Sequence, residues 1–380
     1  MTARLVTFRK NPNWDYSSNS VMSTGYEDIM DKIDIISPKE FLSLNEEGRK
    51  LVVDKIFTEI RSRNYFPINY YNDLGIQREI LKCRDKKVSD LSNGVLDENS
   101  NLGSSLCKFM FPNMHKVVAK GRENNTMWCK FYDDHKLKRA IDFRLRHERI
   151  SNVPSKIYRS LQIIDSNSPT NFSPMKAKAI YEKYCPINGV IYDFSCGFGG
   201  RMLGALSSNN NYTYIGCEPC KETYYYLNNL GRHIEKTFGT SNTFKIHNVG
   251  SEEVKLKSNS IDFAFSSPPY FSLEKYSDEE SQCYIKYPTL DLWFDNYVLP
   301  TIKTIYDSLK RGCYYAVNIS DFKVGNKEVH LVNKWVEFSE LVGFELTEVM
   351  TMKLNIVVGR DGFNSDTTKQ EGVYVFRKPL

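Results

Sequence analysis

The sequence predicts an α/β protein built on a doubly wound, mainly parallel sheet, with a mainly helical region before it. Three observations support this prediction. From residue 175 onward, apolar runs typical of strands alternate with helix-like runs, and such alternation favours a parallel sheet with helices on both faces. Hydrophobic residues make up 41% of the 380 residues, which is enough to bury a large core. No apolar stretch approaches the ~20 residues that span a bilayer.

The elements of the sheet region follow from these runs. Strands are expected at 189–193, 212–217, 244–249, 261–265, 313–319, 344–352 and 372–378. Helices are expected at 175–184, 200–208, 221–238, 289–310 and 327–342. The connection between the last two strands, about residues 353–371, is short and has no helical pattern. These two strands should therefore form an antiparallel hairpin at the edge of the sheet.

The region before the sheet is expected to be helical at 38–64 and 126–150, where apolar residues recur near the helical period. Residues 87–105 are rich in Asn, Ser, Asp and Gly, which predicts a flexible loop. A second polar, proline-bearing stretch at 165–174 suggests a boundary. The chain is accordingly divided into a helical, substrate-binding region at 1–164 and a catalytic domain at 165–380.

A glycine-rich turn follows the first strand of the predicted sheet. The strand runs into Asp193, and Gly197, Gly199 and Gly200 come before the next helix. Glycines at a strand-to-helix turn permit positive φ and a close approach of the backbone to a ligand. The second strand ends in Glu218, at the position where nucleotide-binding folds hold ribose hydroxyls. This pattern predicts a nucleotide-type cofactor.

A rigid corner, Ser267-Pro268-Pro269-Tyr270, follows the fourth strand. Each proline fixes its own φ and removes its own N–H, and the second also holds the first in extended geometry. The Ser267 hydroxyl and nearby carbonyls are left as hydrogen-bond acceptors, and the Tyr270 ring forms a flat wall. An amino group on a planar ring, with two N–H donors and a face that stacks, would suit such a corner. A proline-stiffened loop that only ends the strand is the alternative.

The order of these motifs resembles the S-adenosylmethionine-dependent amino-methyltransferases, which methylate exocyclic amines of adenine or cytosine in DNA. The loop Asp193–Gly200 is similar to that family's cofactor loop, and Ser267–Tyr270 is similar to its catalytic (D/N/S)PPY motif. Residues from about 165 to 380 also resemble phage and bacterial DNA methylases, in which an acidic segment like 274–288 follows the catalytic strand. A serine in first position favours cytosine slightly, but many cytosine enzymes place this motif before the glycine loop, so both bases stay open.

The resemblance implies S-adenosylmethionine as the cofactor and DNA methylation of the restriction-modification kind. Ser267, Pro268, Pro269 and Tyr270 would be catalytic: Ser267 and a proline carbonyl would accept the two N–H bonds of the amine and localise its lone pair. Tyr270 would stack on the base and exclude water. The cofactor site would consist of Asp193, Ser195, Gly197, Gly199, Glu218, Pro219, Gly250, Ser251, Glu252 and Phe172.

A base inside a duplex does not reach such a pocket, so the DNA would be single-stranded or the base flipped. The net charge of +5 is modest, but residues 136–149 hold six Lys/Arg against two acidic residues. These cations would neutralise phosphates, although they could equally form the wet face of a helix. The predicted phosphate contacts are Lys136, Lys138, Arg139, Arg144, Arg146 and Arg149.

Other functional classes are less consistent with the sequence. The nine cysteines are scattered and the lone Cys217–Cys220 pair has no second ligand pair, so no metal site is expected. The absence of a signal peptide favours the cytoplasm, or the host cytoplasm if the protein comes from a phage. An RNA base or a glutamine amide would suit the same chemistry. A non-catalytic DNA-binding subunit and an NAD-dependent dehydrogenase are the rivals from other classes; the dehydrogenase gives no reason for the Ser267–Tyr270 corner.

Overall fold

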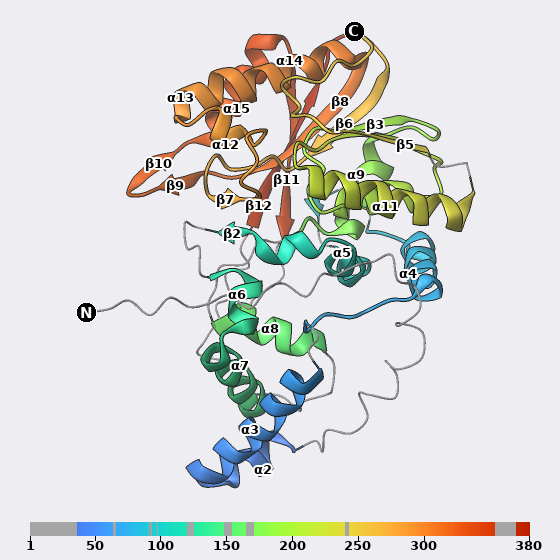
Figure 1. Cartoon of the computed structure of the whole chain (residues 1–380). Helices are drawn as coiled ribbons and strands as arrows, with labels where there is room; N and C mark the ends of the chain where they lie inside the picture. The colour runs from blue at the N-terminus through green and yellow to red at the C-terminus, as the bar shows by residue number, and fades with distance from the viewer. Residues whose placement is uncertain are drawn as a thin grey trace.

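The computed structural model describes residues 36–63, 66–89, 91, 93–96, 98–119, 125–147, 154–164, 171–239, 243–353 and 370–380. Within these ranges no helix is both long and apolar enough to cross a membrane. The structure has two lobes, a sheet with its covering helices and a group of helices below it (Figure 1).

The larger lobe is organised around a sheet of eight strands in the order β1-β11-β12-β8-β6-β3-β4-β5. Neighbours from β5 to β8 are parallel, whereas β12 is antiparallel to both β8 and β11. The predicted α/β fold with its antiparallel C-terminal hairpin is thus confirmed. The strands are β1 (Val95–Leu96), β3 (Val190–Asp193), β4 (Thr213–Cys217), β5 (Thr243–His247), β6 (Ile261–Ser266), β8 (Leu309–Ile319), β11 (Glu345–Lys353) and β12 (Gln370–Arg377).

Helices cover both faces of the sheet, and the period-2 alternation of the strands shows why. In β3, Ile191 belongs to the core on one face and Tyr192 to the core on the other, and neither is exposed. The first face is covered by α9 (Pro174–Tyr184), α10 (Gly200–Leu206) and α11 (Lys221–Phe238). The second is covered by α13 (Leu290–Trp293), η4 (Phe294–Val298), α14 (Leu299–Ser308) and α15 (Leu331–Val342).

The helices before residue 165 divide between two cores. A separate apolar core joins α2 (Pro38–Ser43), α3 (Glu46–Arg63), α6 (Met127–Tyr132), α7 (Asp134–His147) and α8 (Pro154–Ile164). In contrast, α4 (Asp73–Asp85), α5 (Ser104–Met110) and η2 (Pro112–Lys116) contribute buried residues to the first face of the sheet. The buried cores therefore do not divide at residue 165, because α4, α5 and η2 pack with the sheet.

Three expectations about elements are corrected. Residues 87–105 contain β1, which pairs with β11 in parallel, so β1 rather than the hairpin forms this edge of the sheet. The segment predicted as the start of helix 327–342 is instead β10 (Lys327–Val329), paired with β9 (Phe322–Val324) through a turn in which Gly325 has φ +59°. The expected helix 289–310 consists of α13, a π-helical turn and α14, and residues 309–310 already belong to β8.

Candidate active site

A cavity of about 700 Å³ lies where the carboxyl ends of β3, β4 and β6 meet α5 and α8. In the sheet, β4 lies on one side of β3 and β6 lies on the other. The strand order therefore reverses at β3, and ligands of doubly wound sheets bind at such a topological switch point. Residues of the glycine loop and the whole Ser267–Tyr270 corner line this one cavity. The two are joined directly, because Ser266 Oγ donates to Asp193 Oδ1 at 2.8 Å. The glycine loop and the corner therefore open onto one common cleft.

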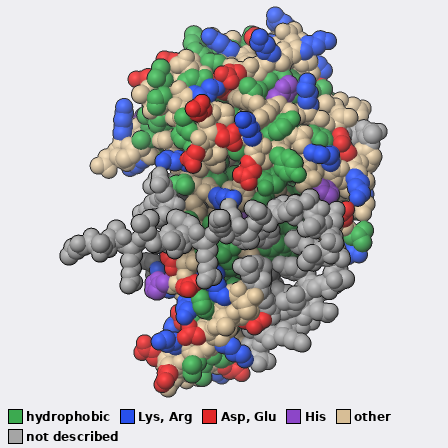
Figure 2. Space-filling model, viewed as in Figure 1, with side chains coloured by type: hydrophobic (Ala, Val, Ile, Leu, Met, Phe, Trp, Pro, Cys, Tyr) green, Lys and Arg blue, Asp and Glu red, His purple; other side chains and the backbone are tan. Residues whose placement is uncertain are grey.

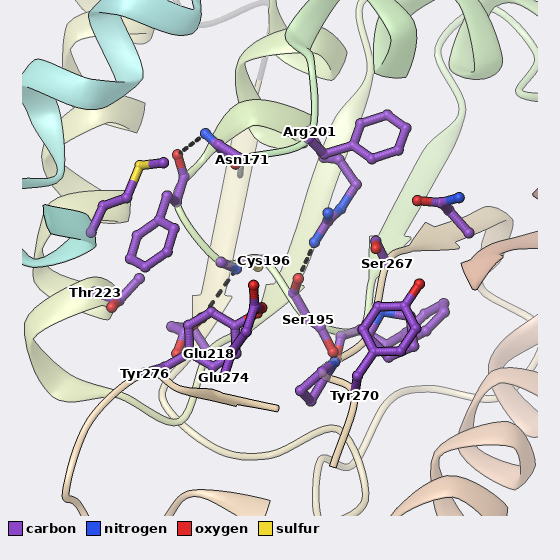
Figure 3. Close-up of a pocket in the computed structure, with 18 of the residues that line it drawn as sticks. Asn171, Ser195, Cys196, Arg201, Glu218, Thr223, Ser267, Tyr270, Glu274 and Tyr276 are labelled. Atoms are coloured by element: carbon purple, nitrogen blue, oxygen red, sulfur yellow. Dashed lines mark hydrogen bonds between the residues drawn. The ribbon is translucent and has the colours of Figure 1, made fainter. Parts of the chain in front are cut away.

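The glycine loop takes its shape from two positive φ angles, +54° at Gly197 and +70° at Gly199. Its outer turn is held by Asn171, whose Nδ2 donates to the carbonyl of Phe198 at 2.8 Å (Figure 3). A Cβ at Gly200 would lie 2.1 Å from the carbonyl oxygen of Phe172. Glycine is therefore required for the segment before α9 to lie against the start of α10, and this contact places Phe172 in the cavity wall.

Asp193 and Gly199 do not line the cavity, which corrects their expected contact with the cofactor. Asp193 is fully buried and receives hydrogen bonds from Arg201 Nε at 2.9 Å and from Tyr214 Oη at 2.6 Å. The carboxylate therefore stabilises the loop between β3 and α10 through these hydrogen bonds and does not face the cavity. Gly199 packs against the Phe111 ring, where a Cβ would lie 2.7 Å from Cζ.

Glu218, at the end of β4, faces the cavity with its carboxylate. Its two oxygens accept from the backbone N–H groups of Gly197 at 3.1 Å and Cys220 at 3.0 Å. Each carboxylate oxygen has a further lone pair available, so two ribose hydroxyls could donate here. Burial, opposed in part by these two hydrogen bonds, raises the pKa of Glu218 from 4.5 to about 8.

A second polar pair is left open at the other end of this wall. Glu252 and Gln282 line the cavity, and Oε2 of the first and Nε2 of the second are buried without a hydrogen-bond partner in the described part of the chain. Oε1 of Glu252 accepts from Lys286 Nζ at 2.9 Å. Such orphaned atoms are costly unless a ligand satisfies them. An unpaired acceptor and an unpaired donor in one cavity wall could bind the amino group and a ring nitrogen of an adenine.

The remaining expected cofactor residues also lie in the wall. Ser195, Gly197, Pro219, Gly250 and Ser251 all line the cavity together with Phe172, Glu218 and Glu252. The acceptors for a ribose and the open polar pair for an adenine fit an adenosine-bearing cofactor such as S-adenosylmethionine. Of the residues that sequence reasoning missed here, Gln282, Cys283 and Tyr297 line the cavity from the segment after β6. They lie in no glycine or proline motif, so no local signal marks them.

The Ser267–Tyr270 corner is held rigidly at the end of β6. Tyr270 Oη accepts from the backbone N–H of Ser320 at 3.1 Å, and the Phe322 ring contacts the Tyr270 ring edge-on at a centroid distance of 5.7 Å. Phe271, just after the corner, has φ +49° and is buried. Ser267 and the Tyr270 ring lie on one side of the cavity, and Glu218 lies across from them (Figure 3).

Beyond Ser267 the sheet adds a polar wall that sequence reasoning missed. Asn318 and Glu371 line the cavity from the ends of β8 and β12 that adjoin the corner, and Lys176 of α9 lines it as well. Asn318 Nδ2 donates to the carbonyl of Gly372 at 3.0 Å. Burial raises the pKa of the Glu371 carboxyl, with a hydrogen bond from Asn318 and the charge of Lys176 opposing the rise. Asn318 could have been predicted as a site residue, because it is a polar residue near the end of a predicted strand.

The acidic segment after the corner lies over the cofactor side of the cavity. Its short strand β7 (Glu274–Lys275) pairs with β2 (Val118–Ala119), which belongs to the region before the sheet. Glu279 accepts from the backbone N–H of Lys221 at 3.1 Å, and Ser281 Oγ donates to the carbonyl of Pro219 at 3.1 Å. Tyr276 and Glu274, joined by a hydrogen bond, project into the same space (Figure 3).

Of the basic residues predicted to contact phosphates, the five that the structure describes do not line the cavity. Lys138 pairs with Asp54 at 2.6 Å and Arg146 with Asp142 at 2.7 Å, while Lys136 donates to Asn125 Oδ1 at 3.2 Å. Arg144 is only 6% exposed, so a surface contact to phosphate is wrong for this residue. Arg139 is exposed, and Arg149 lies outside the described residues. On the face seen in Figure 2, blue and red side chains are interspersed over the lower lobe.

Comparisons with known proteins give matches among solved structures alone. No family model and no curated protein matches the chain. A Methanosarcina mazei protein described as a SAM-dependent methyltransferase has 16% identity over 53% of this chain and 97% of its own, with a TM-score of 0.36. A Pyrococcus furiosus methyltransferase has 17% identity over 55% and 83%, with a TM-score of 0.36. A phosphoethanolamine N-methyltransferase of Haemonchus contortus, in complex with S-adenosyl-L-methionine, has 12% identity over 54% and 52%, with a TM-score of 0.36.

Proposed function

We propose that this protein transfers a methyl group from S-adenosylmethionine to an exocyclic amine of a DNA base, the N4 of cytosine or the N6 of adenine. The observation that carries the proposal is the shared cavity: the glycine loop, Glu218 and the Ser267–Tyr270 corner all line it. A dehydrogenase would use the loop and the carboxylate but would have no need for the corner.

The chemistry asks for orientation rather than for a strong base. S-adenosylmethionine supplies an electrophilic methyl group on a sulfonium. The exocyclic amine is a weak nucleophile because its lone pair is delocalised into the ring. Ser267 Oγ and a carbonyl of the two prolines accept its N–H bonds, which favours a pyramidal nitrogen with a localised lone pair and stabilises the positive charge that develops there. The prolines provide these acceptors without competing donors, since neither has an N–H.

The remaining groups of the corner hold the base and keep water out. Because Tyr270 Oη is fixed by the N–H of Ser320, the ring keeps its orientation and offers a flat face for stacking. The polar wall of Asn318 and Glu371 lies next to the corner, where the ring edge beside the amine would be recognised. A base would have to leave a duplex stack to reach this depth.

Binding and transfer test the proposal separately. Calorimetry with S-adenosylhomocysteine and with NAD should show binding of the first and none of the second, and binding of NAD alone would overturn the proposal. Transfer of label from tritiated S-adenosylmethionine should then be measured on single-stranded DNA, duplex DNA, RNA and a glutamine-containing peptide. Label in DNA is expected. Label confined to RNA or to the peptide would keep the methyltransferase and reject the DNA substrate.

A further inference from the structure

Four cationic side chains of the described residues line the cavity, and two of them differ from the others in their partners. Arg201 is paired with Asp193, and Lys176 donates to the carbonyl of Lys353. Lys108 of α5 and Arg159 of α8 make no ion pair or side-chain hydrogen bond within the described part of the chain; Lys108 lies over the Tyr158 ring, with Nζ 4.7 Å from the centroid. These two cations come from the wall opposite the sheet edge.

Among the described residues, no acidic side chain of the cavity forms an ion pair with Lys108 or Arg159, and each has a partner elsewhere. Glu218 accepts from two backbone N–H groups, and Glu252 is paired with Lys286. Glu274 accepts from Tyr276, and Glu371 is hydrogen-bonded to Asn318. All four come from the sheet edge or from the segment that follows β6. Within the part of the chain that the structure describes, the wall formed by α5 and α8 therefore presents two cations without an ion-paired carboxylate.

The Lys108 position is built rather than incidental. His115 is 1% exposed; its Nε2–H donates to the Lys108 carbonyl at 2.9 Å, and its Nδ1 accepts from Tyr158 Oη at 3.1 Å. This chain of contacts fixes the end of α5 against α8 and holds Tyr158 under the lysine. Burial and the nearby charge of Arg159 lower the pKa of Lys108. Two like charges held together in a partly buried place are unfavourable until an anion joins them.

We propose that Lys108 and Arg159 form an anion site for a phosphate of the DNA strand whose base enters the cavity. This rests on the proposed function and adds the group that holds the substrate backbone. A flipped nucleotide carries its phosphodiester with it, and both arginine and lysine are common phosphate ligands. Gln162, three residues after Arg159 on the same face of α8, also lines the cavity and adds a neutral donor. The phosphate contact is thereby moved from α7 to the α5–α8 wall.

Salt dependence of DNA binding tests the assignment. Lys108→Gln, Arg159→Gln and the double variant should be titrated with a fluorescent single-stranded oligonucleotide over a range of salt concentrations. Each lost contact should reduce the slope of log K against log salt by about 0.7. Lys108→Arg, which keeps the charge, should restore the slope. Lys257→Gln is the matched control, because Lys257 is exposed and does not line the cavity. Unchanged slopes in the double variant would overturn the proposal.

Two further arms separate the possible sources of the anion. S-adenosylhomocysteine should bind the double variant as tightly as the wild type; a loss of about tenfold would mean that the pair holds the cofactor's carboxylate instead. Deoxycytidine monophosphate should bind weakly to the wild type and to the double variant alike. If the double variant lost affinity for this mononucleotide but not for the oligonucleotide, the pair would not hold a DNA strand. Failure of the proposed function would look different, because the wild type itself would then methylate no DNA.

Discussion

At the scale of single residues, Ser267 and Tyr270 should be separable from cofactor binding. Ser267→Ala removes an acceptor for the charge that develops on the amine, and the rate of methyl transfer should fall by about 10²–10³-fold. Tyr270→Ala removes the stacking wall and also leaves the Ser320 N–H unsatisfied. The affinity for S-adenosylhomocysteine should change little in either variant. Single-turnover rates and calorimetry check both halves of the prediction.

The controls for this pair are a serine and a tyrosine outside the cavity. Ser258 is exposed, and Tyr225 is 58% exposed, so alanine at either position should leave the transfer rate at the wild-type level. Full activity in both Ser267→Ala and Tyr270→Ala would move the chemistry away from the corner at the end of β6.

Glu218 predicts how cofactor affinity depends on pH. Its folded pKa of about 8 lies above the ordinary value of 4.5 because burial penalises the charged form. Ribose hydroxyls donating to the carboxylate favour the ionised form, so binding below about pH 8 must release a proton. The affinity for S-adenosylhomocysteine should therefore rise between about pH 6 and about pH 9. Calorimetry in buffers of different ionisation enthalpy detects the released proton.

Glu218 also makes the free energy of unfolding depend on pH, in the direction opposite to the cofactor affinity. In the unliganded protein Glu218 holds its proton between about pH 4.5 and about pH 8, whereas the unfolded carboxyl has lost it, so the free energy of unfolding falls as the pH rises through this window. Glu218→Gln should flatten both dependences and weaken cofactor binding. A pH-independent affinity in the wild type would show that the carboxylate does not contact the ligand.

The site residues at strand ends could be predicted from the sequence, but the full set of residues that line the cavity could not. Gly197, Glu218 and Ser267 each carry a local signal, because backbone freedom, charge after a strand and paired prolines are visible in a few letters. Lys108 and Glu371 carry no such signal, because only the fold places them in the lining of the same cavity. Asp193 was correctly predicted to lie at the glycine loop, but its role was not. It is buried, and its hydrogen bonds with Arg201 and Tyr214 make it a positioning residue.

At the scale of elements, the contact between α9 and α10 should be intolerant of a side chain at Gly204. A Cβ there would lie 2.3 Å from the carbonyl oxygen of Pro174 and 3.0 Å from the Ala177 Cβ. Gly204→Ala should lower the free energy of unfolding by about 1–3 kcal/mol. Since α10 follows the glycine loop, the affinity for S-adenosylhomocysteine should fall as well. Denaturant unfolding and calorimetry measure the two effects.

The same substitution at Gly75 in α4 is the control. Its Cβ would meet Asn72 Oδ1, a side-chain atom, at 3.3 Å, and the stability should stay within about 1 kcal/mol of wild type. Equal stability of Gly204→Ala and Gly75→Ala would contradict the close packing of α9 on α10.

The elements that sequence reasoning missed are those fixed by neighbours rather than by their own pattern. The strands of the parallel sheet contain apolar runs that mark them in the sequence, and their bounds were found within a few residues. In contrast, β1 is two residues long and exists because Val95 and Leu96 pair with the end of β11. The helix 289–310 was expected as one piece, and the π-helical turn at Phe294–Val298 divides it. Both features depend on packing that a local window does not contain.

At the scale of the whole molecule, the sheet region should not fold without the segment before it. Ile80, Leu106 and Phe111 are fully buried in the core on the first face of the sheet. A fragment of residues 165–380 would expose that face, so it should aggregate or unfold without a cooperative transition. Expression of this fragment beside the full chain, followed by thermal unfolding, is the measurement. A monomeric fragment that binds S-adenosylhomocysteine would contradict the shared core.

The division into a helical region at 1–164 and a catalytic domain at 165–380 was inferred from the polar stretch at 165–174. Composition marks where a chain turns polar, but it does not show that Phe111 crosses back to pack on Gly199. The helical character of the first region was foreseen, whereas its contribution of α5 and α8 to the cavity was not, because both walls of a cleft are known only once the lobes are placed together.

The atom that receives the methyl group tests the central claim most directly. DNA incubated with the protein and deuterium-labelled S-adenosylmethionine is digested to nucleosides and measured by mass spectrometry. The Ser267–Tyr270 corner predicts a labelled methyl group on N4 of deoxycytidine or N6 of deoxyadenosine. Label on a ring carbon, on a sugar or phosphate oxygen, or on no nucleoside at all would contradict it.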